Sequence, residues 1–218
     1  AGRMHLSAED TDLARLIALL HDIGRFEQLK RYDSFEPGTM DHAAYGVKVL
    51  FDEGMIRRFL PDDKWDSIIY TAIAHHSDYE LPEISDPQTL LHAKLIRDED
   101  KLDNCRVKLV DSTSTFINVS EEELGTQNIT QKVYETVFEN KCILSADRVT
   151  QMDYWVSYIV YFFDINFKES FDIIAENDYL NRIIDRISYS NPVTKEQMEN
   201  IRVYMQNFIN SHTNSQSF

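Results

Sequence analysis

Apolar residues recur along this chain at the spacing that places them on one face of a helix. The first such stripe consists of Leu13, Leu16, Ile17 and Leu20. Positions three and four apart share a helix face, so the stripe predicts an amphipathic helix. The run Ser7–Asp10 in front of it has the form of a capping box, and Gly24 behind it predicts the end of the helix.

Start and stop signals predict further helices. Asp41 is the expected cap of the helix that follows it. Pro61 predicts the start of a helix that ends at His75–His76, and Pro87 predicts the start of another that carries Asp100. Each of these helices therefore has an aspartate or histidine near one end or along its face.

The second half of the chain continues the helical pattern. Between Thr126 and Asn191 there is neither glycine nor proline, which predicts helices joined by polar loops. Thr194–Gln197 forms a second capping-box pattern, and the apolar face behind it consists of Met198, Ile201, Met205, Phe208 and Ile209. No segment alternates strictly between apolar and polar residues, as a half-buried strand would. We therefore expect an all-α fold.

Composition narrows the class of protein. Of the 218 residues, 43% are hydrophobic, which suffices for a sizeable core. The net charge of -15 argues against a nucleic-acid polymer as partner, because a phosphate backbone requires a basic surface. No apolar run approaches the ~20 residues of a membrane span, so we expect no membrane partner. With no signal peptide evident and only Cys105 and Cys142 present, a reducing, cytoplasmic location is predicted.

Histidines and aspartates stand at separated helix positions and suggest a metal site. They are the dipeptide His21–Asp22, then His42, the pair His75–His76, and Asp100. Imidazole and carboxylate groups together bind divalent metals. Simpler interpretations remain open: His21–Asp22 could be a polar pair capping a helix end, His42 could decorate a helix start, and His75–His76 could be a surface pair.

This ordered set resembles the HD-domain metal-dependent phosphohydrolases over roughly residues 10–105. His21–Asp22 resembles the defining dipeptide of the family. Asp98–Asp103 resembles the segment that carries the family's last aspartate ligand, with Asp100 in the ligand position. His42, His75 and His76 resemble the extra histidines of members that hold a second metal. The resemblance implies an all-α HD-domain-like bundle with one or two divalent ions, which could be Mn, Ni, Co, Mg, Fe or Zn.

The resemblance also predicts the domain organisation. The family has a further histidine on a helix upstream of the dipeptide, whereas this chain begins shortly before His21. His5 precedes the predicted cap at Ser7 and is a poor substitute. We expect residues 1–110 to form an HD-type metal-binding core that lacks its first helix. Residues 111–218 are expected to form a helical C-terminal region packed on that core.

The function implied by the resemblance is hydrolysis of a phosphoester in a small phosphorylated substrate, with a nucleotide as one candidate. Asp22 or Asp100 would orient the attacking water, and Arg25 or Lys101 would bind the phosphate oxygens. The stretch Ser77–Pro82 does not match the Gly-Tyr-Pro signature, which argues against hydrolysis of cyclic di-GMP.

Two other classes of function remain open. Some HD-fold proteins use the same ligands for oxygen chemistry, so a diiron oxygenase is one alternative. The other is a regulatory domain that binds a metal or ligand without turnover, which the absent upstream histidine favours. The aromatic run Tyr154–Phe163 is predicted to be a core helix rather than a platform for substrate.

Overall fold

Helices account for the regular secondary structure of residues 2–35 and 38–213, the part of the chain that this computed structural model describes. These residues contain no β-strand, so the all-α prediction is confirmed. Two units divide the chain, residues 1–100 and residues 101–218. The division falls inside one long helix, α5 (Pro87–Val110).

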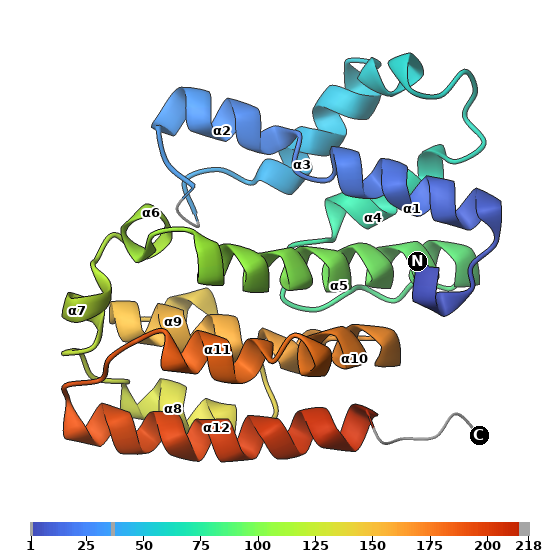
Figure 1. Ribbon diagram of the computed structural model, residues 1–218. Helices are drawn as coiled ribbons and strands as arrows, with labels where there is room; N and C mark the ends of the chain where they lie inside the picture. The colour runs from blue at the N-terminus through green and yellow to red at the C-terminus, as the bar shows by residue number, and fades with distance from the viewer. Residues whose placement is uncertain (1, 36–37, 214–218) are drawn as a thin grey trace. The chain divides into compact units, whose positions relative to one another are not determined.

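The first unit consists of short and medium helices that precede and include the first part of α5 (Figure 1). Its elements are η1 (Gly2–Met4), α1 (Ala8–Leu20), α2 (Gly24–Tyr32), α3 (His42–Val47), the π-helical turn η2 (Lys48–Asp52), η3 (Met55–Arg58) and α4 (Asp66–Ala74). Helix α3 packs against both α2 and α4, and α1 packs against α4.

The predicted stripe of α1 forms part of the core of this unit. Leu13, Ile17 and Leu20 are buried and pack with residues of α4 such as Ile69 and Ile73. The cap at Ser7 is confirmed, because its hydroxyl accepts a hydrogen bond from the backbone N–H of Asp10. Burying this stripe fixes the direction in which α1 ends, and hence the position of the dipeptide that follows.

Helix α4 begins later than the sequence predicts. Its first residue is Asp66, whereas the proline rule placed the start near Pro61. The Arg57 side chain donates to the carbonyl of Asp62 and to the carboxylate of Asp66, which holds the intervening residues in a turn. Because this contact comes from a neighbouring element, local sequence signals cannot reveal it.

The second unit continues from α5 through further helices (Figure 1). They are α6 (Thr113–Ile117), α7 (Glu121–Leu124), α8 (Gln131–Val137), η4 (Ser145–Asp147), α9 (Gln151–Val160), η5 (Tyr161–Asp164), α10 (Lys168–Glu176), α11 (Tyr179–Asp185) and α12 (Pro192–Thr213). Trp155 and Phe162 are fully buried, which confirms that the aromatic run belongs to the core. In this unit α12 packs against α10 and α11.

The predicted apolar face of α12 is confirmed, but its predicted cap is not. Met198, Ile201, Met205 and Ile209 are buried. Thr194 lies inside the helix and donates its hydroxyl to the carbonyl of Gln127. The cap is supplied by Asn191, whose Oδ1 accepts from the backbone N–H groups of Val193 and Thr194.

Both cysteines are free. Cys105 is buried in the second core, and burial raises the pKa of its thiol to about 12. None of the helices in the described part of the chain is both long and apolar enough to cross a membrane.

Candidate metal centre

The end of α1 orients the ring of His21, a candidate metal ligand. The last carbonyl groups of a helix lack partners in a following turn. His21 supplies one, because its Nδ1 lies 2.9 Å from the carbonyl oxygen of Ala18. A carbonyl oxygen only accepts hydrogen bonds, so Nδ1 carries the proton and Nε2 keeps its lone pair. The helix-capping and metal-binding interpretations of this residue are therefore compatible.

His76 repeats this arrangement at the end of α4. The helix ends at Ala74, and Nδ1 of His76 lies 2.8 Å from the carbonyl oxygen of Ile73. Its Nε2 therefore also keeps a lone pair. Since the C-terminus of a helix carries a partial negative charge, the ends of α1 and α4 both favour a cation beside these rings.

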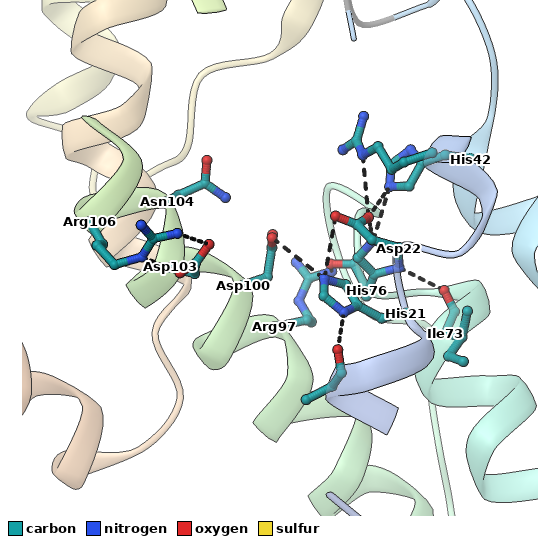
Figure 2. Close-up of polar contacts among 12 residues, drawn as sticks. His21, Asp22, His42, Ile73, His76, Arg97, Asp100, Asp103, Asn104 and Arg106 are labelled. Carbon is teal, nitrogen blue, oxygen red and sulfur yellow. Dashed lines mark hydrogen bonds and ion pairs between the residues drawn. The ribbon is translucent and has the colours of Figure 1, made fainter. Parts of the chain in front are cut away.

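Asp22 completes a three-residue cluster with His21 and His76. Each offers one ligand atom, and these atoms all lie within 4.8 Å of one another. Figure 2 shows the three side chains together, with Asp100 near them on α5. The Asp100 Oδ1 lies 3.9 Å from the His21 Nε2. Residues from α1, α4 and α5 thus converge, although they are far apart in the sequence.

The two carboxylate oxygens of Asp22 face different histidines. Oδ2 lies 3.6 Å from the Nε2 of His21, whereas Oδ1 lies 3.3 Å from the Nε2 of His42 and 3.6 Å from that of His76. His42, the first residue of α3, also lies 3.0 Å from His76, measured between their Nε2 atoms. A carboxylate with a different imidazole at each oxygen suits a site for two cations.

The charge states of these groups fit a divalent cation. Burial raises the pKa of Asp22, but the neighbouring rings of His42, His76 and His21 and the guanidinium of Arg25 outweigh burial and hold this pKa well below its usual range. Asp22 is therefore ionised at neutral pH. Burial lowers the pKa of His42, which favours the neutral imidazole that metals bind.

Arg25 places a guanidinium beside this cluster. Its Nε lies 3.3 Å from Asp22 Oδ1, and its Nη1 donates to the side-chain oxygen of Gln28 at 3.2 Å. Gln28 is 1% exposed and donates in turn to the hydroxyl of Thr39 at 2.8 Å. Neither Gln28 nor Thr39 was predicted from the sequence. The place of Gln28 one helical turn after Arg25 was the local feature that could have indicated a contact between Gln28 and Arg25.

Gly24 has a role different from the predicted helix end. It is the first residue of α2, whereas α1 ends at Leu20, so the prediction of Gly24 as a helix stop was wrong. A Cβ at position 24 would lie 2.0 Å from the carbonyl oxygen of His42. Only glycine allows this close approach of the backbone of α3, and with it the position of His42 beside Asp22.

We expect Gly24→Ala to destabilise the protein by about 1–3 kcal/mol, because the new methyl group overpacks a contact with backbone. Urea unfolding of the metal-free protein would measure the change. The matched control is Gly46→Ala, whose Cβ would meet only ordinary contacts, the nearest being a side-chain carbon of Ile23 at 3.4 Å. Equal stability of the two variants would contradict the proposed role of Gly24.

The structure does not bring every predicted site residue to the cluster. The His75 ring pairs with Asp78, with Nδ1 2.6 Å from Oδ2, rather than with Asp22. Lys101 pairs with Asp164 in the second unit, at 2.6 Å. His5 is exposed. His75 and His76 differ because successive residues past the end of a helix point in different directions, which the dipeptide alone does not disclose.

Comparison with known proteins places these residues in a family. The family model described as HD domain matches residues 1–105. No curated protein and no solved structure matches the chain. HD domains typically bind divalent metals and are usually metal-dependent phosphohydrolases. The matched range contains the cluster of His21, Asp22 and His76 together with Arg25 and Asp100. Residues 1–105 of this chain therefore match the HD domain.

Proposed function

We propose that this chain hydrolyses a phosphoester in a small substrate by using one or two divalent cations. The observation that carries the proposal is the cluster of two imidazole nitrogens and an ionised carboxylate, with a guanidinium at its edge. A cation held by His21, Asp22 and His76 would act as a Lewis acid toward phosphate oxygens and would lower the pKa of water.

The residues around the cluster take separate roles in this proposal. The carboxylate of Asp100, whose Oδ1 lies 3.9 Å from the His21 Nε2, would orient the attacking water and could supply a further ligand oxygen. Arg25 binds a phosphate oxygen, because a guanidinium fork matches the geometry of phosphate. Its Nε and Nη1 are held by Asp22 and Gln28, and no described contact uses Nη2. Lys101 is not assigned to the phosphate, since its ammonium pairs with Asp164.

Net charge limits the size of the substrate. A chain of net charge -15 repels an extended polyanion. A small phosphomonoester or nucleotide, by contrast, can respond to the local positive potential of Arg25 and a bound cation. We therefore propose low-molecular-weight phosphoesters rather than nucleic-acid polymers.

The proposal predicts turnover that requires a metal. Phosphomonoesters, cyclic nucleotides and nucleoside polyphosphates would be assayed with Mn²⁺, Co²⁺, Ni²⁺ and Mg²⁺, and we expect hydrolysis that EDTA abolishes. Iron-dependent oxygen consumption without phosphate release would instead support the oxygenase alternative. A compound that raises Tm without being converted would support a regulatory domain.

We also propose that His42 contributes to a second cation subsite that shares Asp22. His42→Ala is expected to reduce the binding of Mn²⁺ from about two ions per chain to one, because it removes the imidazole nearest to Asp22 Oδ1. Isothermal titration would measure the stoichiometry. His75→Ala is the matched control, since its ring pairs with Asp78, and should leave the stoichiometry unchanged. Two ions bound to the His42 variant would contradict this subsite.

A further inference from the structure

The segment that carries His76 has no regular secondary structure of its own. After α4 ends at Ala74, the chain runs through turns and bends to α5, which begins at Pro87. Such a segment needs tertiary contacts to hold a side chain in one place. The hydrogen bond to Ile73 sets the ring orientation of His76, but it does not fix the path of the backbone that follows.

One buried side chain, Arg97 on α5, donates hydrogen bonds to several carbonyl groups of that backbone. Its Nη1 donates to the carbonyl oxygens of His75 at 2.9 Å, Asp78 at 2.7 Å and His76 at 3.4 Å. Its Nη2 donates to the carbonyl oxygen of Tyr79 at 3.4 Å. Arg97 is 2% exposed, so these carbonyl groups replace the water that a guanidinium would otherwise bind.

The position of Arg97 links two parts of the candidate metal centre. Asp100 lies one helical turn further along α5, on the same rigid element. Figure 2 shows Arg97 beside His76, with Asp100 on the next turn of α5. The helix that supplies Asp100 thus also holds the segment that supplies His76. A flexible lysine could not reach four diverging acceptors in this way.

We propose that Arg97 is a positioning residue that holds His76 in place for metal binding. This inference rests on the proposed metal centre. It predicts that the segment from His75 to Tyr79 is already ordered before metal binds, and that weakening the contacts of Arg97 lowers metal affinity through His76. Supporting residues that orient a metal ligand typically contribute about 10- to 100-fold in affinity.

Arg97→Lys tests this role. We expect Co²⁺ affinity, measured by titration, to fall about 10- to 100-fold, with a changed visible absorption spectrum of the bound Co²⁺. The matched control is His92→Ala. His92 is also buried on α5, but its Nε2 contacts Asp10 at 3.2 Å instead of the His76 segment. This variant should lose stability yet keep the wild-type affinity and spectrum.

Wild-type affinity and spectrum in Arg97→Lys would overturn the proposal, as would equal losses of affinity in both variants. If Arg97→Lys does not fold, hydrogen exchange of the wild-type protein would test whether the His76 segment is ordered before metal binds. The amides of His75 and Asp78, which donate to the carbonyl groups of Thr71 and His75, should exchange slowly without metal and change little when it is added. Protection of these two amides that appears only with metal would overturn the proposal. Failure of the wild-type chain to bind any divalent cation would contradict the proposed function itself.

Discussion

Replacing Asp22 with asparagine is expected to abolish metal binding and phosphoester hydrolysis together. Asp22 supplies the only carboxylate within the three-residue cluster, and its two oxygens face different histidines. An amide keeps the shape of the side chain but removes its negative charge and one acceptor oxygen. Because even residues that only support a ligand contribute about 10- to 100-fold, loss of this ligand should lower metal affinity by more than about 100-fold.

Elemental analysis and metal titration would measure this loss, and circular dichroism would show whether the helices remain. The matched control is Asp12→Asn, on α1, where the carboxylate is exposed and pairs with Arg15. We expect this control to keep its metal and its activity. Full metal occupancy in the Asp22 variant would show that the cluster does not bind the metal.

The second large effect concerns stability. We expect Asp153→Ala to lower the free energy of unfolding by on the order of 3 kcal/mol, because it removes the fully buried carboxylate that accepts hydrogen bonds from three partly buried backbone N–H groups. Asp153 is fully buried, and its carboxylate accepts from the backbone N–H groups of Thr130 at 2.8 Å, Val149 at 3.0 Å and Thr150 at 3.0 Å. It therefore joins the start of α8, the loop before α9 and α9 itself.

Urea unfolding of the metal-free protein would measure this change. Asp172→Ala is the matched control, since Asp172 makes a partly exposed ion pair with Lys168 on the same helix, α10, and accepts no backbone N–H from another element in the described contacts. Exposed pairs of this kind contribute at most about 1 kcal/mol. Similar losses in the two variants would mean that the contacts of Asp153 stabilise the second unit no more than a surface pair does.

Local sequence patterns predicted the helices well where one face had to be buried. The stripe of α1 and the face of α12 are both in the cores, because helical periodicity reports directly which side chains leave water. Helix boundaries were less reliable. Gly24 matched the local rule for a helix stop, yet glycine is needed there because the carbonyl group of His42 comes too close for a Cβ. Thr194 matched the rule for a helix cap, yet its hydroxyl donates to the carbonyl of Gln127.

The sequence by itself determined the fold class, the HD resemblance and the residue types of the candidate metal site. These depend on residue identity, order and periodicity, which are one-dimensional properties. Tertiary structure alone decided which of two adjacent histidines, His75 or His76, faces Asp22, and that Lys101 pairs with Asp164. It also brought Arg97 against the segment of His76. These outcomes depend on directions and distances between elements far apart in the chain, which packing sets and residue order does not.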